Sequence, residues 1–270
     1  MKESEEYMKV ISIINLKGGV GKTYTAYNIA YELQKRGKKV LLLDNDKQGN
    51  LSKAAGVYNP EGECAAAKAL LAKYNNPYEL ITKHTNNMDI ITANMSLMSA
   101  VWEIAGSSGS QIDAYSNLIT KSMDNFNLPF PDTIDNTYEY MIIDNPPDIA
   151  FNVISALMIT DEVIVPLKID EWALEGLDII AEQISEAKQL NPHIKLLGAL
   201  VTMYQNNDTN VAGLEWLEQK SKVKLLGRIR YTDKAAESTF FNKAAYEYSP
   251  RCGAAQDYKN FVTRYLEKER

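Results

Sequence analysis

Short apolar runs recur along the chain and alternate with segments whose apolar positions follow a helical period. The apolar runs cover residues 9–15, 40–43, 88–92, 140–143, 162–166, 195–203 and 223–229. The clearest helical segments cover residues 25–36, 176–189 and 254–267. Continuous apolar runs predict strands that are covered on both faces, as in parallel sheets. The alternation therefore predicts an α/β fold: a doubly wound, mainly parallel sheet with helices on both faces.

The chain shows no internal repeat and no low-complexity linker. Its 270 residues, 45% of them hydrophobic, suit one large α/β domain or at most two small ones. We expect a single domain over residues 9–270, preceded by a disordered polar tail over residues 1–8. Residues 104–137 have the least regular pattern, and loops around one helix are expected there.

The cysteine content, the lengths of the apolar runs and the net charge argue against several classes of protein. Cys64 and Cys252 lie far apart, which argues against a disulfide framework or a zinc site. No stretch approaches 18 consecutive apolar residues and the start of the chain is acidic, so a cytoplasmic protein without a transmembrane helix is expected. The net charge of −6 argues against uniform wrapping of nucleic acid, although a local basic patch remains possible.

A glycine-rich segment, Lys17–Thr23 (KGGVGKT), follows the first predicted strand and precedes the first predicted helix, which is the setting that a phosphate-binding loop requires. Its glycines let backbone N–H groups approach phosphate oxygens, and the helix N-terminus adds partial positive charge. We expect Lys22 to bridge the β- and γ-phosphates of ATP and Thr23 to ligate Mg²⁺. The expected nucleotide-binding residues are Lys17, Gly18, Gly19, Val20, Gly21, Lys22, Thr23 and Tyr24.

Three carboxylates, Asp44, Asp46 and Asp144, lie at or just past the ends of predicted strands, where open α/β sheets bind their ligands. A site for nucleotide and Mg²⁺ needs a carboxylate beside the metal and a polar group that orients the attacking water. The alternative interpretation is that each carboxylate only caps a helix or a turn.

Lys17 is not required by an ordinary phosphate-binding loop. Within one subunit Lys22 is already expected to bind the phosphates, but in a dimer Lys17 could reach the nucleotide of the partner subunit. With this lysine the sequence resembles the deviant Walker A ATPases of the ParA/MinD superfamily, whose K-G-G-x-G-K-[ST] loop carries it. The alternative is a surface lysine with no role.

The resemblance is to the ParA (Soj-like) branch and covers residues 9–265. It includes LLLDNDKQGNLS (switch I), IIDNPPD (switch II), VIVPLKIDEWALEGLDII, and LLGALVTMY, the strand that leads to the base pocket. It implies that Asp46 orients the attacking water and that Asp44 and Asp144 support the metal with Thr23. The implied catalytic residues are Lys17, Lys22 and Asp46.

Four positions depart from the pattern of that branch. Lys47 stands where proline is usual in switch I, and Asp148 replaces a small residue after the two prolines of switch II. Arg230 stands where a proline usually begins the loop near adenine, and Tyr24 replaces a threonine. Loss of the proline removes a fixed φ, so switch I is expected to be looser.

The resemblance implies an ATP-dependent partition ATPase that is slow alone. Its ATP-bound homodimer would bind nonspecific DNA, associate with the nucleoid and be stimulated by a ParB-like centromere-binding protein. Basic residues near the C-terminus are the candidates for phosphate-directed DNA contacts, unless they form only a solvated face: Arg228, Arg230, Lys234, Lys243 and Arg251. The mixed charges of residues 265–270 disfavour a MinD-like membrane helix.

Two other functions remain open. A metabolic synthetase or amidase of the cobyrinate or dethiobiotin type shares the fold but needs a pocket for a second substrate. An ATPase that positions another cargo could use the same nucleotide switch without acting on DNA. The sequence does not identify the cargo or the stimulating partner.

Overall fold

The computed structural model describes residues 7–106, 114–119, 134, 137–170 and 173–269. Within these residues, eight strands form one sheet in the order β3-β4-β2-β5-β1-β6-β7-β8. The strands are β1 (Lys9–Ile13), β2 (Val40–Asp44), β3 (Ile81–Lys83), β4 (Met88–Ile91), β5 (Tyr140–Asp144), β6 (Glu162–Leu167), β7 (Lys195–Tyr204) and β8 (Leu225–Arg230).

All neighbouring strands pair in parallel except β3, which is antiparallel to β4 at the edge of the sheet. The seven predicted strands are all present, and the predicted doubly wound, mainly parallel sheet is confirmed. The short β3 was not predicted, because three partly exposed residues carry no apolar run.

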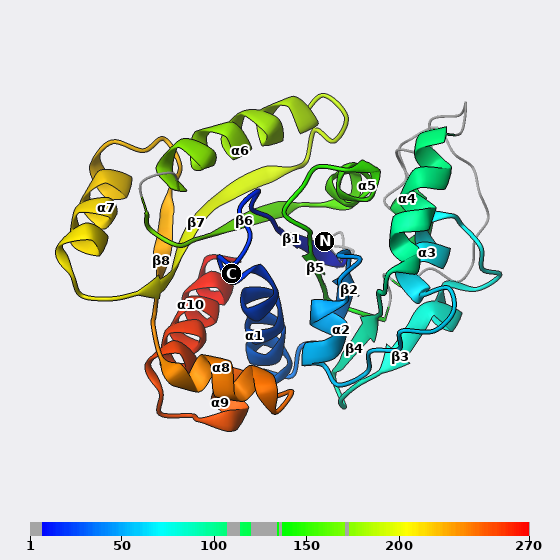
Figure 1. Ribbon diagram of the computed structural model, residues 1–270, viewed down its shortest axis with the longest axis horizontal. Helices are drawn as coiled ribbons and strands as arrows, with labels where there is room; N and C mark the ends of the chain where they lie inside the picture. The colour runs from blue at the N-terminus through cyan, green and yellow to red at the C-terminus, as the bar shows by residue number, and fades with distance from the viewer. Residues whose placement is uncertain (1–6, 107–113, 120–133, 135–136, 171–172, 270) are drawn as a thin grey trace, which may run out of the picture.

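Helices cover both faces of the sheet (Figure 1). The helices are α1 (Lys22–Gln34), α2 (Asn50–Ala54), α3 (Ala65–Leu70), α4 (Ser96–Gly106), α5 (Phe151–Ile159), α6 (Ala173–Ala187), α7 (Asp208–Gln219), α8 (Asp233–Phe240), α9 (Ala245–Tyr248) and α10 (Gly253–Glu269), with 3₁₀ turns η1 (Pro77–Leu80) and η2 (Ala114–Leu118). Residues of α1, α2 and α10 share one core with one face of the sheet. The opposite face packs against α3, α4 and α5 in one core and α5, α6 and α7 in another.

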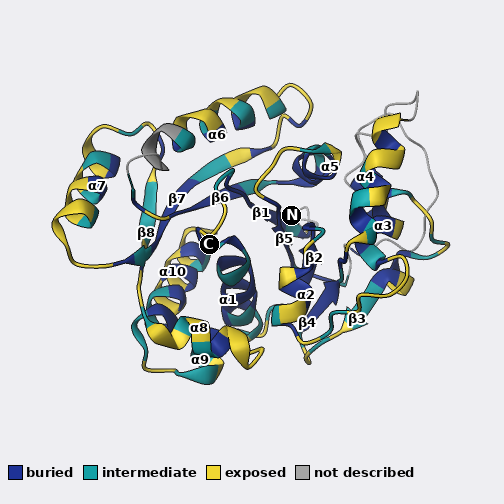
Figure 2. Ribbon diagram, viewed as in Figure 1, coloured by how far each residue is buried: buried dark blue, intermediate teal, exposed yellow. Residues whose placement is uncertain are grey.

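The central strands show why their sequences are continuously apolar. Every residue of β2 and of β5 is buried, because each strand has neighbours in the sheet and helices above and below (Figure 2). Even the acidic residues that end these strands, Asp44 and Asp144, are 0% and 1% exposed. Two buried carboxylates thus lie at the C-terminal ends of neighbouring central strands, where a negative charge is costly unless a partner compensates for it.

The N-terminal segment differs in part from the expected disordered tail. Residues 1–6 lie outside the described residues, while Met8, which was placed in the tail, is 2% exposed and packs in the core. Most of the irregular segment 104–137 also lies outside them, apart from the end of α4, η2 and single residues. Over the described residues, no helix combines the length and the apolar character needed to cross a bilayer.

The arrangement of β2, β5 and β1 positions the site. These strands are consecutive neighbours in the sheet, and their register aligns Asp44 with Asp144 and Asp144 with Ile13. Because the strands are parallel, the three loops that follow them emerge side by side. They are the phosphate-binding loop after β1, switch I after β2 (residues 45–49) and switch II after β5 (residues 145–150).

Candidate nucleotide-binding site

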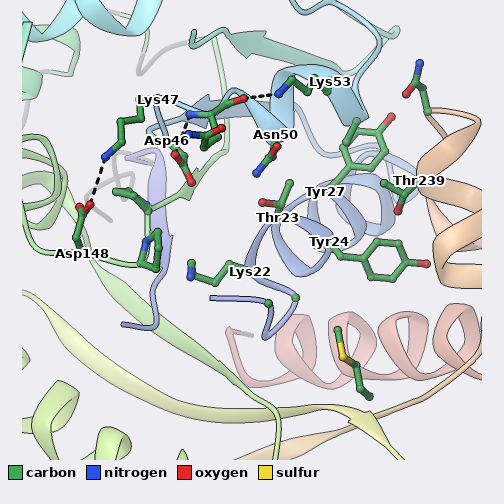
Figure 3. A pocket seen from close by; sticks show the side chains of 18 of the residues that line it. Lys22, Thr23, Tyr24, Tyr27, Asp46, Lys47, Asn50, Lys53, Asp148 and Thr239 are labelled. Atoms are coloured by element: carbon green, nitrogen blue, oxygen red, sulfur yellow. Dashed lines mark hydrogen bonds and ion pairs between the residues drawn. The ribbon is translucent and has the colours of Figure 1, made fainter. Parts of the chain in front are cut away.

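The three loops open onto a cavity of about 670 Å³, within the range of small-molecule sites (Figure 3). Phosphate-loop and switch residues line one end, and residues of α1, α2, β7, α8 and the segment after α8 line the other. The lining residues are Gly19, Gly21, Lys22, Thr23, Tyr24, Tyr27, Asp46, Lys47, Gln48, Asn50, Lys53, Ala54, Pro146, Pro147, Asp148, Met203, Thr239, Asn242 and Lys243.

The phosphate-binding loop is fixed by its own backbone and by β7. Gly21 precedes α1 with φ of 82°, a left-handed conformation that favours glycine. The hydroxyl of Thr202 donates a hydrogen bond of 2.8 Å to the carbonyl of Val20, whose side chain is buried. Val20 therefore anchors the loop to β7 rather than lining the cavity.

Lys22 begins α1 and is only 8% exposed. Its Nζ donates hydrogen bonds of 2.9 Å to the carbonyl of Asn15 and 3.0 Å to that of Lys17, both in the loop around it. Burial lowers the pKa of Lys22, and the carboxylates of Asp144 and Asp46 oppose that effect. An anionic ligand would give this buried ammonium the countercharge that favours its protonated form.

Thr23 and Asp144 lie in direct contact at the same end of the cavity. The Thr23 hydroxyl donates a hydrogen bond of 2.6 Å to Asp144 Oδ2, while the buried Oδ1 of Asp144 has no hydrogen-bond partner among the residues that the structure describes. Burial raises the pKa of Asp144 well above its usual range, with the Asp44 carboxylate as the next cause. A hydroxyl beside an unsatisfied carboxylate oxygen fits Mg²⁺, which prefers oxygen ligands and keeps several waters.

Asp44 lies behind the cavity and is absent from its lining. Its Oδ2 accepts hydrogen bonds of 2.8 Å from the Ser52 backbone N–H and 2.7 Å from the Ser52 hydroxyl, and its Oδ1 accepts one of 3.2 Å from the Asp46 N–H. Burial raises the pKa of Asp44 to about 6. These contacts fix switch I, as in the capping alternative, so the predicted role of Asp44 near the metal stays a prediction.

Asp46 lines the cavity at the start of switch I. Its Oδ1 accepts a hydrogen bond of 2.9 Å from the Gln48 N–H, which closes a tight turn. Gly49 follows with φ of 63°, and a Cβ there would lie 2.5 Å from the Tyr58 ring and 2.7 Å from the Ala93 carbonyl. Glycine is therefore required for this turn, which points Asp46 toward the phosphate end (Figure 3).

The structure separates Lys17 from the other expected nucleotide-binding residues. Lys17 Nζ forms an ion pair with Asp170 Oδ2, just past β6, and neither Lys17 nor Gly18 belongs to the cavity lining. The carbonyl of Lys17 still supports Lys22. In a single subunit the Lys17 side chain is thus engaged away from the cavity, and its expected role toward a second subunit stays a prediction.

The end of the cavity away from the phosphate loop includes residues that the sequence did not single out. Tyr24 was predicted, and its hydroxyl lies 3.1 Å from Ser238 Oγ; burial raises its pKa to about 12. Tyr27, one helical turn along, pairs with His84 at 3.0 Å. Met203 was indicated only as part of the strand leading to the base pocket; it is the last residue but one of that strand and has φ of 53°.

The five cations predicted to contact nucleic acid do not act as one group. Lys243 lines the cavity. Arg230 forms a two-point ion pair with Asp257, with both N–O distances 2.9 Å, and Lys234 pairs with Glu237 at 2.7 Å. Arg228 lies over the Tyr204 ring at 4.5 Å, and Arg251 is exposed. Acidic side chains thus already neutralise two of the five.

Comparisons with known proteins identify a matching family model, related sequences and a similar solved structure. The family model described as an AAA domain matches residues 8–196. The chain is 27% identical to the chromosome-partitioning ATPase Soj of Thermus thermophilus over 96% of this chain and 95% of Soj, and 31% identical to the sporulation initiation inhibitor protein Soj of Bacillus subtilis over 79% of each. Cobyrinic acid a,c-diamide synthase of Mycobacterium smegmatis, solved with an ATP analog and magnesium, has a TM-score of 0.78 at 25% identity, covering 97% of both chains.

Proposed function

The chain belongs to the AAA-domain family and, within it, to the ParA/MinD superfamily of ATPases, and from this premise we propose that it is a partition ATPase whose ATP-bound dimer binds nonspecific DNA. The observation that carries the chemical part is the meeting of Lys22, Thr23 and Asp144 at the phosphate end of the cavity. The partition role is supported by the similarity to Soj over nearly the whole chain.

The cavity binds ATP with Mg²⁺ in this proposal. ATP supplies the phosphoryl group, and Mg²⁺ neutralises negative charge on its phosphates. Lys22 and the amides of the loop would bind the phosphates, while Thr23 and Asp144 would hold the metal. Asp46 orients the water that attacks the γ-phosphate. Within the described residues, no group of three or more His, Cys, Asp or Glu side chains could hold a metal by itself, so the phosphates are needed to complete the site.

Two subunits close face to face in the ATP state. Lys17 then exchanges its ion pair with Asp170 for the phosphates of the partner's nucleotide. Because that exchange requires a second subunit, hydrolysis by one subunit alone is slow, and a ParB-like partner that favours the closed arrangement accelerates it.

DNA binds through cations that have no acidic partner. Lys224, Arg264 and Lys268 gather where α10 passes the edge strand β8, and the Lys224 ammonium lowers the pKa of Lys268. In the part of the chain that the structure describes, no carboxylate lies within ion-pair distance of these three. Such like-charged groups are stabilised by phosphates, so this patch supports DNA binding better than Arg230 or Lys234.

A gel shift on random-sequence DNA at two salt concentrations tests the proposal. The Asp46→Ala protein is expected to shift DNA at low salt with ATP and Mg²⁺ but not with ADP, and Lys22→Ala is expected to give no shift. Lys224→Gln is expected to weaken binding and to reduce the salt slope by about one. Lys188→Gln, which changes an exposed lysine beyond α6 on the opposite face, serves as the control. ATP binding without any low-salt shift would contradict the DNA part.

The structural likeness to cobyrinic acid a,c-diamide synthase favours a second candidate function, an ATP-dependent amidation or related ligation. That reaction needs a second, carboxylate-bearing substrate in or beside the cavity. The two candidates differ in what stimulates ATP turnover. A small carboxylate substrate together with an amine donor would accelerate a synthetase, whereas DNA and a ParB-like protein would accelerate a partition ATPase.

A further inference from the structure

The two switch-loop positions that depart from the ParA pattern lie opposite each other. Lys47 of switch I and Asp148 of switch II form an ion pair, with Nζ and Oδ2 3.5 Å apart (Figure 3). Both residues also line the cavity. The pair therefore spans the gap between the two loops at the phosphate end, a short distance along the chain from Asp46 and Asp144.

Below this pair the two loops are joined by buried amides. Asn45 Nδ2 donates a hydrogen bond of 2.8 Å to Asn145 Oδ1, and Asn152 Nδ2 donates one of 2.8 Å to the Asn45 carbonyl. All three asparagines are at most 4% exposed. Because buried, satisfied amides fix the backbone, the loops do not depend on the ion pair to stay together. Lys47 and Asp148 can therefore change partners without the loops separating.

The ion pair is open to exchange. The side chains of Lys47 and Asp148 are 37% and 49% exposed, and ion pairs at such exposure contribute little to stability. Burial lowers the pKa of Lys22, and the Asp148 carboxylate opposes that effect after those of Asp144 and Asp46, so it is close enough to act on the lysine that faces the phosphates. A terminal phosphate carries more negative charge and more acceptor oxygens than one carboxylate, so it competes for Lys47 and is repelled by Asp148.

We propose that the terminal phosphate of ATP replaces Asp148 as the partner of Lys47, so that Lys47 binds this phosphate and Asp148 opposes it. Together the two residues set the preference of the cavity for ATP over ADP. ADP lacks the terminal phosphate and leaves the Lys47–Asp148 pair intact. This inference rests on the proposed function only in that the cavity binds adenine nucleotides. It assigns Lys47 to the nucleotide of its own subunit, unlike Lys17.

Affinities of the full-length protein for a non-hydrolysable ATP analogue and for ADP, measured by calorimetry with Mg²⁺, test the inference. Lys47→Gln is expected to lower the affinity for the analogue about tenfold, a magnitude typical of losing one charge-assisted contact. Its affinity for ADP is expected to change less than about twofold. Asp148→Asn is expected to raise the affinity for the analogue about threefold. The substitution removes the carboxylate that competes with the terminal phosphate for Lys47 and that repels this phosphate. Lys47→Arg keeps the charge and should retain most of the affinity.

The two substitutions are expected to change the affinity for the analogue in opposite directions, which distinguishes this inference from a purely structural role of the ion pair. If the ion pair only braced the loops, Lys47→Gln and Asp148→Asn would change analogue binding in the same direction, and that result would overturn the inference. An equal loss for the analogue and ADP in Lys47→Gln would also overturn it. In both cases analogue binding by the unaltered protein would leave the proposed ATPase function standing.

A matched control lies at the other end of the same strands. Lys38 and Glu139 form an ion pair of 2.5 Å between the residues that precede β2 and β5, with side-chain exposures of 35% and 37%. Lys38→Gln and Glu139→Gln remove the same charges from the same pair of strands, far from the cavity. Both are expected to leave the ratio of analogue to ADP affinity unchanged, and thermal unfolding without nucleotide verifies that each variant is folded.

Discussion

The two ends of the cavity are built in different ways. At the phosphate end, three loops follow three neighbouring parallel strands, and buried backbone contacts fix the groups that face the ligand. At the other end, side chains from α1, α2, β7, α8 and the segment after α8 meet without a common motif. Tyr24 and Ser238, for example, are in contact although 214 positions separate them.

This difference shows what each end can do. The phosphate end combines a buried ammonium, an unsatisfied carboxylate oxygen and ordered amides, so its contribution to binding is electrostatic and large. The other end offers aromatic and aliphatic surface with a few polar groups, and each contact there is worth little by itself. Substitutions at the two ends should therefore differ in magnitude and in the step that they affect.

The largest effect is expected for Lys22→Ala. The substitution removes the buried charge that binds the phosphates, and loss of such a group costs roughly 2–5 kcal/mol. ATP affinity measured by calorimetry should fall at least about thirtyfold, the factor that corresponds to the lower of these costs. If Lys22→Ala bound ATP within a few-fold of the unaltered protein, the phosphate end would not be where binding energy is concentrated.

Asp46→Ala should separate hydrolysis from binding at the same end. Loss of the group that orients the attacking water is expected to lower the turnover number about 10²–10⁴-fold, while ATP affinity stays within a few-fold. Phosphate release in single-turnover experiments, together with calorimetry, measures the two quantities. Normal turnover in Asp46→Ala would show that another residue orients the water.

Asp144→Asn should make binding less dependent on Mg²⁺. If Thr23 and Asp144 hold the metal, as proposed, the unaltered protein is expected to bind ATP about tenfold or more tightly with Mg²⁺ than with a chelator. In Asp144→Asn this ratio should approach one. A ratio that stays unchanged would mean that the unsatisfied oxygen of Asp144 does not serve the metal.

Tyr24→Phe at the opposite end should have the smallest effect. It removes the hydroxyl that lies 3.1 Å from Ser238 Oγ but keeps the ring that meets Tyr258 edge-to-face. The expected cost is about 1 kcal/mol in the free energy of unfolding and at most about a fivefold loss in ATP affinity. Urea unfolding and calorimetry measure the two effects, and a loss as large as that of Lys22→Ala would erase the contrast between the ends.

The sequence was informative where function follows from consecutive residues. The seven apolar runs all became strands, and KGGVGKT marked the phosphate loop because its glycines and lysine are contiguous. Sequence reasoning was weaker where a role depends on distant partners. The residues next to each position in the sequence do not show that Ser52 donates two hydrogen bonds to Asp44 or that Lys243 lines the cavity. They also do not show that Lys47 of one loop pairs with Asp148 of another.

The same limit applies to the predicted DNA contacts. Arg230 and Lys234 are basic and exposed, as predicted, yet Asp257 and Glu237 neutralise them. The more favourable cluster of Lys224, Arg264 and Lys268 joins an edge strand to the last helix, so residues about 40 positions apart come together only in the fold. Charge along the chain does not reveal which cations have acidic partners, so the sequence does not distinguish this cluster from the other C-terminal cations.

Sedimentation velocity of the Asp46→Ala protein tests most directly whether ATP brings two subunits together over this cavity. The account predicts a dimer with ATP and Mg²⁺, a monomer with ADP, and a monomer under both conditions for Lys22→Ala. A protein that binds ATP tightly yet sediments as a monomer at every concentration would contradict it, because Lys17 would then have no second nucleotide to reach.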